Sequence, residues 1–417
     1  MRGESRSIVL RYDDAAAVVR REAVRARAGM SGRRGAERVR LGEASGRVLA
    51  EVAAADRDMP PFARATRDGF ACQAADLTAD VGAGGLRVVG QLRAGEVWTL
   101  GEIGPGQAAE IMTGAAVPAG ADCVVMVEHI AVADGRIRLA AARELVPGEN
   151  IVPVGAEARA GDCVVPAGRR LGAAEIAAAA ACGAAELAVF ARPRVAILAT
   201  GDELVDVAEQ PLAQQIRNSN SYSLTEQVRG AGGSAEIAAI VRDDAAATEG
   251  AIRAAAGCDL ILLTGGVSMG KFDFVEQALV DLGAEFFFTG ALIQPGKPVV
   301  FGKLGERYFF GLPGNPISTM VTFALFAGPM LRALGGEDEC GPRFGMARLE
   351  EDVHVKAGLT RFLPARVESD VRGARVKRVG WQGSGDLAAA ARANGFLVVP
   401  ETAEQVRAGE IVTVMEI

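Results

Sequence analysis

The sequence has very few of the side chains that bind transition metals. Its 417 residues include only two histidines, His129 and His354, and six cysteines, none of which forms a Cys-x-x-Cys pair. The spacing of a structural zinc site is therefore absent. Scattered cysteines in a chain of this length are typical of a reducing compartment, so we expect a cytoplasmic protein.

Long hydrophobic runs and an excess of positive charge are also lacking. The opening MRGESRSIVLRYDD has no apolar segment of the kind found in a secretory signal. The most apolar helical run, AAEIAAAAACGAAELAVFA, is interrupted by Glu175 and Glu186. That stretch is too short between charges to cross a membrane. The net charge of -7 argues against nucleic acid or an anionic membrane as the main partner. A small anionic substrate remains compatible, because the charge of a local pocket decides its binding.

The pattern of elements predicts a multidomain α/β plus β protein. At roughly 100–200 residues per domain, the length predicts two to four domains. Helical spacing in VRREAVRARAGM, RVRLGEASGRVLAE and AAEIAAAAACG predicts a helical N-terminal domain whose parts pack together around an inserted small β domain. From Arg194, alternating strands and helices predict a three-layer α/β/α domain with a mainly parallel sheet. Short strands and turns then predict a C-terminal β-barrel-like domain. The expected domains are 1–56 with 156–192 (helical), 57–155 (inserted β), 193–335 (α/β) and 336–417 (C-terminal β).

Three charged turns follow predicted strands of the α/β domain. They are TGDEL with Asp202 and Glu203, VRDD with Asp243, and TGGVSMGKFDF with Lys271 and Asp273. Ligands of open parallel sheets bind beyond the carboxyl ends of the strands, so these turns are expected to meet. Acidic side chains in one crevice repel one another without a cation. Mg²⁺ is the expected partner, because it takes carboxylate and water oxygens and bridges phosphates.

Glycine and proline loops lie beside these turns. Gly265 and Gly266 allow a ligand to approach the backbone, and the next helix would point its first N–H groups at an anion, with Ser268 adding a hydroxyl. QPGKPV places Lys297 in a rigid turn, and GLPGNPIST places Asn315 between two prolines. Taken singly, each loop is equally compatible with an ordinary turn, and NSNSY with a simple helix cap.

Seven motifs together resemble one family. In chain order, RDGFA, MTGAAVP, TGDEL, VRDD, TGGVSMGKFD, QPGKPVVFG and GLPGNPIST resemble the molybdopterin molybdenumtransferases, the family that includes the gephyrin E domain. The resemblance runs from about Val24 to about Pro400. It implies an elongated homodimer that inserts molybdate into adenylylated molybdopterin, releases AMP and depends on Mg²⁺. An adenylyltransferase or a recipient molybdoenzyme would be a further partner.

The resemblance also implies roles for individual residues. Glu203, Asp243 and Asp273 would hold Mg²⁺. Lys297 and the glycine-loop amides would hold phosphates, and Lys271, Arg361 and Ser384 would hold molybdate. Asp68, Thr113 and Glu157 would reach the site from the inserted domain of a second subunit. The remaining cofactor-binding positions belong to the two glycine loops: Gly265, Gly266, Ser268, Pro313, Asn315 and Pro316.

Several positions depart from the family pattern. Arg67 lies in the altered entry to the RDGFA turn, Glu157 replaces an aspartate, and Gln294 replaces the first lysine of KPGKP. Lys271 stands where an acidic residue is common. These departures bear on which side chain contacts which anion, and the reaction class does not depend on them.

Two alternatives share parts of this pattern. An enzyme that adenylylates molybdopterin, or a nicotinamide-nucleotide amidase, would have the TGDE and GGVS core, but the inserted and C-terminal β domains weigh against both. A catalytically weak molybdopterin-binding scaffold would look similar throughout. The carboxylates present in the sequence favour an enzyme.

Overall fold

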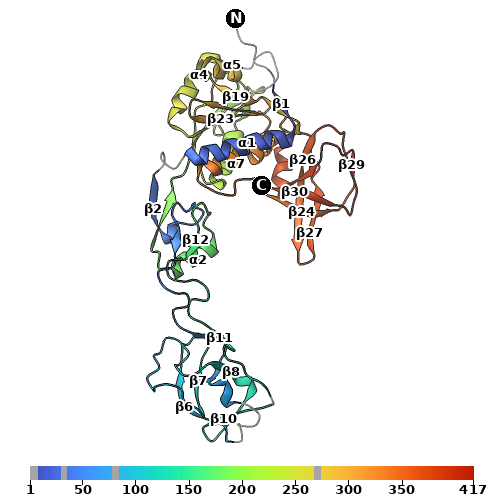
Figure 1. Cartoon of the computed structure of the whole chain (residues 1–417). Coiled ribbons are helices and arrows are strands. Elements are labelled where there is room, and N and C mark those ends of the chain that lie inside the picture. The colour runs from blue at the N-terminus through green and yellow to red at the C-terminus, as the bar shows by residue number, and fades with distance from the viewer. Residues whose placement is uncertain (1–7, 30–34, 78–83, 142, 267–273) are drawn as a thin grey trace.

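The computed structural model describes residues 8–29, 35–77, 84–141, 143–266 and 274–417, and the chain forms an elongated molecule (Figure 1). Its central domain contains a six-stranded sheet in the order β17-β14-β18-β23-β22-β19. The first four strands are parallel, and β22 is antiparallel to both of its neighbours. The strands are β14 (Arg194–Ala199), β17 (Ser234–Ile237), β18 (Leu260–Thr264), β19 (Glu285–Phe288), β22 (Val300–Leu304) and β23 (Arg307–Leu312).

Helices cover both faces of this sheet. One face packs against α1 (Tyr12–Ala28), α3 (Asn220–Gly230), α6 (Pro316–Thr322) and α7 (Gly328–Leu334). The other packs against α4 (Ala245–Ala254) and α5 (Phe274–Asp281). Strands β14 and β18 are continuous apolar runs because both of their faces are covered. The predicted three-layer α/β/α domain with a mainly parallel sheet is therefore confirmed.

One helix runs through α6 and α7 and contains a π-helical segment, Phe323–Ala327. Pro329 follows that segment and has no N–H to donate to a carbonyl one turn earlier, which favours the wider turn. The helix Pro316–Leu334 is long and apolar enough to cross a membrane, but 78% of its most apolar window is buried inside the fold. Its apolar surface is part of the central core.

The expected helical N-terminal domain is wrong in two respects. Helix α1 packs on α7 of the central domain rather than on α2 (Ala173–Ala181), and β1 (Val9–Leu10) pairs with β20 (Gly290–Ala291). RVRLGEASGRVLAE begins in a strand, β2 (Ala36–Arg40), paired with β13 (Glu186–Phe190). The pairing buries part of Val39 against Leu187, and Gly46, with φ of 72°, is unsuited to a helix. This unit also contains β3 (Ala53–Ala54) paired with β12 (Cys163–Val165).

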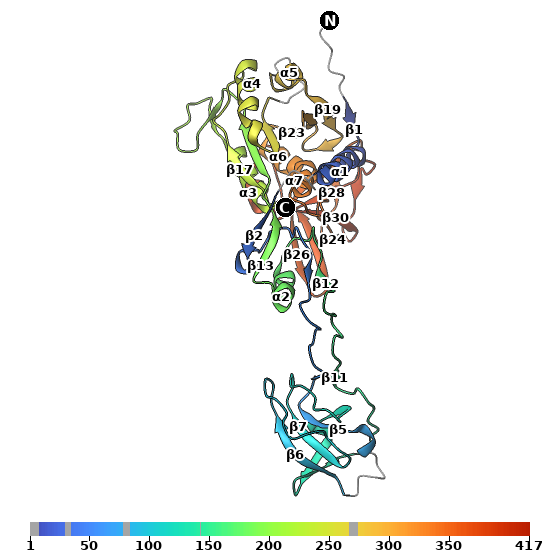
Figure 2. The ribbon, with the colours of Figure 1, turned by 60° about the vertical axis from the view of Figure 1, so that its left-hand side comes forward.

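The inserted β domain lies at one end of the molecule. Figure 2 shows two extended segments leading to it, joined by the pair β4 (Arg64–Ala65) and β11 (Ile151–Val152). Its sheet has the order β8-β5-β7-β6-β10-β9. The strands are β5 (Gly69–Cys72), β6 (Leu86–Leu92), β7 (Gln107–Ile111), β8 (Cys123–Met126), β9 (Ile130–Ala133) and β10 (Arg136–Leu139).

The C-terminal domain is a closed five-stranded barrel. Its strands run in the order β26-β27-β24-β30-β28, and β28 pairs back with β26. A short strand of the central domain, β21 (Ile293–Gln294), adds to β26 in parallel. The barrel strands are β24 (Phe344–Leu349), β26 (Thr360–Asp370), β27 (Gly373–Arg378), β28 (Gly395–Val399) and β30 (Ile411–Glu416). Beside them lie α8 (Leu387–Arg392) and the pair β25 (Val353–His354) and β29 (Gln405–Val406).

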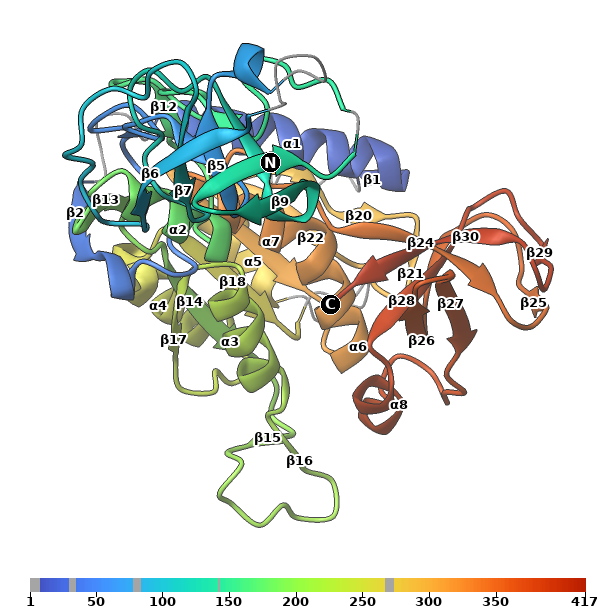
Figure 3. The ribbon, with the colours of Figure 1, turned by 90° about the horizontal axis from the view of Figure 1, so that it is seen from below.

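A long arm projects from the central domain directly after β14. It begins and ends with β15 (Leu204–Val205) and β16 (Ile216–Arg217), which pair in parallel, and Figure 3 shows its loop standing away from the body. The arm therefore starts beside the strand ends at which the charged turns were predicted.

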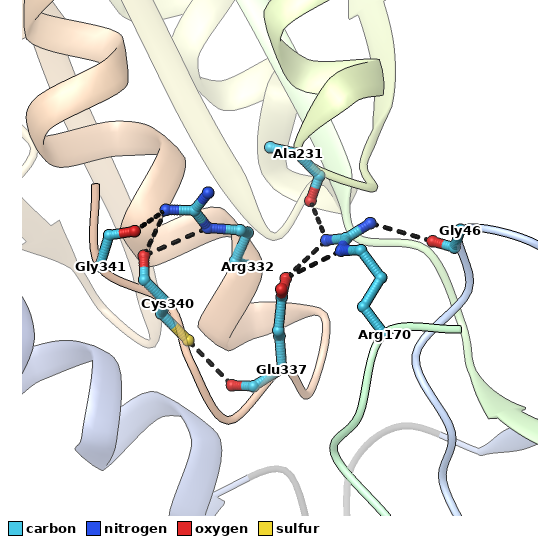
Figure 4. Close-up of polar contacts among 7 residues, drawn as sticks. All are labelled: Gly46, Arg170, Ala231, Arg332, Glu337, Cys340 and Gly341. Atoms are coloured by element: carbon cyan, nitrogen blue, oxygen red, sulfur yellow. Dashed lines mark hydrogen bonds and ion pairs between the residues drawn. The ribbon is translucent and has the colours of Figure 1, made fainter. Parts of the chain in front are cut away.

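A polar cluster around the buried Glu337, with half-buried Arg170, Arg332 and Cys340, joins three parts of the chain (Figure 4). Arg170, which follows β12, donates to Glu337 at 2.6 Å and to the carbonyl oxygens of Gly46 and Ala231. Arg332 of α7 donates to the carbonyl oxygen of Cys340. Glu337 and Cys340 lie in the connection to the barrel, so the cluster fixes the N-terminal unit, the central domain and this connection together.

Candidate functional site

Main-chain hydrogen bonds hold the carboxyl ends of the parallel strands together. Beyond β14, the N–H of Thr200 donates to the carbonyl oxygen of Thr264 at 2.9 Å, and that of Gly201 donates to Val241 at 3.2 Å. Beyond β18, the N–H of Gly265 donates to Leu312 at 3.3 Å. Three predicted loops, TGDEL, TGGVS and GLPGNP, therefore start side by side, as the parallel topology predicts.

Glycine is required where these loops touch. Gly265 has φ of 90°, and a Cβ there would lie 2.3 Å from the carbonyl oxygen of Thr200. Gly201 has φ of 150°, which favours glycine, and the flexible Glu203 side chain of the same loop occupies the space where a Cβ would lie, with a carboxylate oxygen at 2.6 Å. The absent side chains allow the backbones to approach and allow the Glu203 carboxylate to lie against the turn.

The acidic residues occupy the ends of neighbouring strands. Glu203 follows β14, Asp243 follows the segment that extends β17, and both are exposed. Asp202 accepts a hydrogen bond from the N–H of Asp243 at 3.4 Å, which brings the two turns together. Asp244 instead caps α4 by accepting from the N–H of Ala247 at 2.8 Å.

Within the described part of the chain, no three His, Cys, Asp or Glu side chains are grouped closely enough to hold a metal ion. Asp273, the third expected ligand, lies outside that part, as do Ser268 and Lys271. Glu203 and Asp243 are carboxylates open to solvent, which is the chemistry that Mg²⁺ takes while it retains several waters. These two carboxylates are therefore compatible with Mg²⁺.

Lys297 lies in the turn between β21 and β22 with its side chain exposed, and its carbonyl oxygen accepts from the N–H groups of Ala291 and Val299. Gly296 has φ of 109°, and a Cβ there would meet a methyl group of Thr322 at 2.5 Å. The chain departs from the family pattern one turn earlier, at Gln294. Gln294 is in register with Arg361 of β26. The position at which the family pattern has a lysine is therefore paired with an arginine of the barrel.

The proline-glycine loop is attached to the barrel. Asn315 donates from Nδ2 to Oγ of Ser384 at 2.9 Å, and the N–H of Ile317 donates to the carbonyl oxygen of Ser384 at 2.9 Å. Pro316 occupies the first turn of α6, where a missing N–H costs nothing, and Pro313 is buried. Two predicted positions, Asn315 and Ser384, are thus in direct contact.

The residues expected from the inserted domain form separate contacts. Asp68 accepts from both the N–H and the hydroxyl of Thr113, each at 2.7 Å. These two hydrogen bonds, the main-chain one first, hold the pKa of the Asp68 carboxyl below its usual range. Glu157, in one of the two extended segments that lead to the inserted domain, accepts a hydrogen bond from Arg64 at 2.9 Å. Within one chain, the sheet of the inserted domain lies far from the strand ends of the central domain (Figures 1 and 2).

One polar residue beneath the loops was assigned only a capping role from the sequence. Asn220, in NSNSY, donates from Nδ2 to the hydroxyl of Thr264 at 2.9 Å and to the carbonyl oxygen of Gly314 at 2.7 Å. A polar side chain at a helix start gives the same sequence pattern whether it caps its own helix or bonds elsewhere. Only the spatial positions of β18 and β23 distinguish the two roles.

Comparisons with known proteins cover nearly the whole chain. The MoeA N-terminal region (domain I and II) matches residues 10–183, a probable molybdopterin binding domain matches 196–333, and the MoeA C-terminal region (domain IV) matches 346–417. A molybdopterin molybdenumtransferase from a Nostoc species is 34% identical over 393 residues, which cover 91% of this chain and 88% of the relative. One from Staphylococcus epidermidis is 32% identical over 380 residues, 90% of each chain.

A solved structure agrees with these sequences. The molybdopterin biosynthesis MoeA protein from Pyrococcus horikosii superposes with a TM-score of 0.70 and 32% identity, covering 98% of this chain and 99% of that chain. The expected resemblance to the molybdopterin molybdenumtransferases is therefore confirmed over about 90% of the chain. The chain belongs to the MoeA family, the molybdopterin molybdenumtransferases.

Proposed function

We propose that this chain inserts molybdate into adenylylated molybdopterin and releases AMP in molybdenum cofactor biosynthesis. The observation that carries this proposal is the meeting of the TGDEL, TGGVS and GLPGNP loops at one edge of the central sheet. Both substrates are anions, and the reaction breaks the phosphoanhydride between the pterin phosphate and AMP. Such a step needs an in-line oxygen and neutralised phosphate charge, and it needs no covalent nucleophile from the protein.

The residues divide this work by charge. Glu203, Asp243 and Asp273 would hold Mg²⁺, which when bound supplies positive charge to the phosphates. Lys297 and the glycine-loop amides of Gly265 and Gly266 would hold phosphate oxygens. Molybdate would be held from the barrel side by Arg361 and Ser384, together with Lys271. The hydrogen bond from Asn315 to Ser384 supports a shared role for the GLPGNP loop and the barrel.

We further propose that the site is completed by a second copy of the chain. Asp68 and Thr113 are hydrogen-bonded to each other in the inserted domain, near the pair β4 and β11. The two extended segments of Figure 2 separate this domain from the central domain of the same chain. Most soluble homodimers have two-fold symmetry, which allows two such arms to be exchanged between sites. Each site would then use the inserted domain of the partner.

We place the protein in the cytoplasm. All six cysteines are free, and the sulfurs of Cys72 and Cys123 lie 3.7 Å apart on paired strands without forming a disulfide. Free cysteines are typical of reducing compartments. Small-molecule anions rather than nucleic acid or membrane remain the expected ligands, since the net charge is -7.

The deciding experiment is an AMP-release assay with adenylylated molybdopterin. We expect AMP to form only when molybdate and Mg²⁺ are both present. A parallel incubation with ATP and molybdopterin tests the adenylyltransferase alternative, which predicts an adenylylated product. Absence of AMP release together with retained molybdopterin binding would instead support a scaffold.

A further inference from the structure

One side-chain amide bonds to the ends of two neighbouring strands. Asn220 is the first residue of α3 and is half-buried. Its Nδ2 donates to the hydroxyl of Thr264, the last residue of β18, at 2.9 Å. The same nitrogen donates to the carbonyl oxygen of Gly314, in the loop after β23, at 2.7 Å. Both N–H bonds of the amide are thus directed away from its own helix.

The two loops joined by Asn220 leave the sheet where the parallel pairing of β18 with β23 ends, at Thr264 and Leu312. A Cβ on Gly314 would come 3.7 Å from the Cα of Gly265, so the loops approach backbone to backbone without side chains between them. Beyond that pairing, the described residues of the two loops are joined by hydrogen bonds from the N–H of Gly265 to Leu312 and from the hydroxyl of Thr264 to Pro313, both at 3.3 Å. Both of these distances are longer than the two made by Asn220, at 2.9 and 2.7 Å, so the amide adds two shorter hydrogen bonds that tie both loops to α3.

We propose that Asn220 is a positioning residue for the anion site, holding the glycine turn after β18 against the proline-glycine loop after β23. This inference rests on the proposed function, because those loops are the ones assigned to the phosphates and molybdate. The amide acts through Gly314 and Thr264 and does not itself touch substrate. A loop displaced by an ångström places its donors wrongly for a bound anion, and catalysis is sensitive to that error.

A purely local role in α3 is fulfilled by another residue. Asn218 accepts from the N–H of Ser221 at 3.1 Å and donates to its hydroxyl at 2.9 Å, so it closes the start of the helix. Asn218 is buried, of the same residue type and two positions away, and both of its side-chain contacts stay within this turn. It is therefore a matched control for damage to α3 that leaves the two loops untouched.

The test compares Asn220→Ala, Asn220→Asp and Asn218→Ala in the full-length protein. We expect Asn220→Ala to lower kcat/KM about tenfold, mainly by raising the KM values for both anionic substrates, because two hydrogen bonds are lost. Asn218→Ala should lower the unfolding midpoint at least as much as Asn220→Ala does. Its kcat/KM should change by less than about twofold. Equal losses of kcat/KM in the two variants, or an unchanged kcat/KM in Asn220→Ala, would overturn the proposal.

Asn220→Asp adds a pH signature that a structural role does not predict. An ionised carboxylate has no N–H for the Gly314 carbonyl oxygen, whereas a protonated one has a single O–H to donate. Activity of this variant relative to wild type should therefore rise as the pH falls, and that of Asn220→Ala should not. A flat ratio for Asn220→Asp would contradict the assigned contact with Gly314.

Amide hydrogen exchange separates this proposal from the function on which it rests. In ligand-free protein, Asn220→Ala should speed exchange of the Gly265 N–H at least about fivefold, because the turn is released, whereas Asn218→Ala should not. This readout needs no turnover. If wild type released no AMP, the proposed function would fail while the exchange result still showed whether Asn220 positions the loop. Unchanged exchange at Gly265 would count against the positioning role.

Discussion

Nη2 of Arg170 lies 2.6 Å from Oε2 of Glu337, with side chains 21% and 9% exposed. The same guanidinium donates to two main-chain carbonyl oxygens from separate parts of the chain, Gly46 and Ala231. A buried ion pair with its remaining donors satisfied is specific in geometry, because any shift leaves a charge without a partner. This pair therefore connects the N-terminal unit to the central domain at a defined point.

Removing one partner of this ion pair should be costly. Glu337→Ala leaves the Arg170 guanidinium largely buried without its carboxylate, and we expect a loss of about 3 kcal/mol in the free energy of unfolding. Urea unfolding measures it. The control is Glu226→Ala, which removes the exposed pair with Arg229 and should cost no more than about 0.5 kcal/mol. Similar losses of unfolding free energy in the two variants would show that the Arg170–Glu337 pair stabilises the fold no more than an exposed ion pair does.

Magnesium dependence should be weakened by changes at the strand ends. Glu203→Gln and Asp243→Asn each remove the charge of a proposed Mg²⁺ ligand, so we expect at least a tenfold fall in AMP release at low Mg²⁺ and a higher Mg²⁺ concentration for half-maximal activity. Asp206→Asn serves as control, because Asp206 is an exposed carboxylate of the arm bonded to the N–H of Ala208. Unaltered Mg²⁺ titrations in the first two variants would remove both residues from the metal site.

Hybrid dimers test whether the inserted domain works in the partner's site. At a low Mg²⁺ concentration, Asp68→Asn and Asp243→Asn chains should each have less than about a tenth of wild-type activity alone. In a dimer of one of each, one site would contain both changes and the other neither, so an equal mixture should recover about a quarter of wild-type activity. If Asp68 acted within its own chain, every site of the mixture would carry one change and no activity would return.

Asp68 should titrate at an unusually low pH. The main-chain and hydroxyl donors of Thr113 lower the pKa of Asp68 in the folded state, so this contribution to stability is present above the unfolded pKa and is lost as the pH falls through the folded one. Thr113→Val removes the hydroxyl donor and keeps the N–H. We expect the pKa of Asp68 to rise in that variant and to remain below its ordinary value, as measured by carboxyl NMR titration. An unchanged pKa would mean that the hydroxyl contact is absent in solution.

The cysteines should differ sharply in reactivity. Cys163 is exposed, whereas burial raises the pKa of the Cys340 thiol to about 11, so only about one molecule in a thousand carries that thiolate at pH 8. Iodoacetamide at pH 8 should modify Cys163 first and leave Cys340 intact, as peptide mass spectrometry would show. Protein unfolded in urea provides the control, in which all six react. Rapid labelling of folded Cys340 would contradict its buried environment.

The sequence was most informative where a local pattern has one structural cause. A parallel strand whose two faces are both covered needs apolar side chains on both sides, so the apolar runs of β14 and β18 predict buried parallel strands. The charged turns were then expected to meet, because parallel strands end at the same edge. The main-chain bonds between Thr200, Thr264 and Leu312 agree with that expectation for the loops themselves. Which atoms contact a substrate stays a prediction.

The errors arose where the partner is distant in sequence. The spacing in RVRLGEASGRVLAE predicts a helix where β2 forms. The residues of β2 form a strand because they pair with β13, which lies about 150 residues later in the chain. The stretch NSNSY is compatible with a simple helix cap and does not reveal the second role of Asn220, because its bonds to Thr264 and Gly314 depend on how two other strands are placed. Periodicity and capping rules describe neighbours along the chain and contain no information about such contacts.

The placement of α1 has a consequence for how the protein is made. Ala15, Val19 and Ala23 of α1 are buried against a core that includes α7, yet the ribosome synthesises α1 first and α7 about 300 residues later. At 5–20 residues per second, the nascent apolar stripe waits roughly 15 to 60 s for its final neighbour. The inserted domain can fold during that delay, before the central domain is complete. Until α7 is synthesised, the apolar residues of α1 lack their final neighbours, and we expect a chaperone to bind this helix.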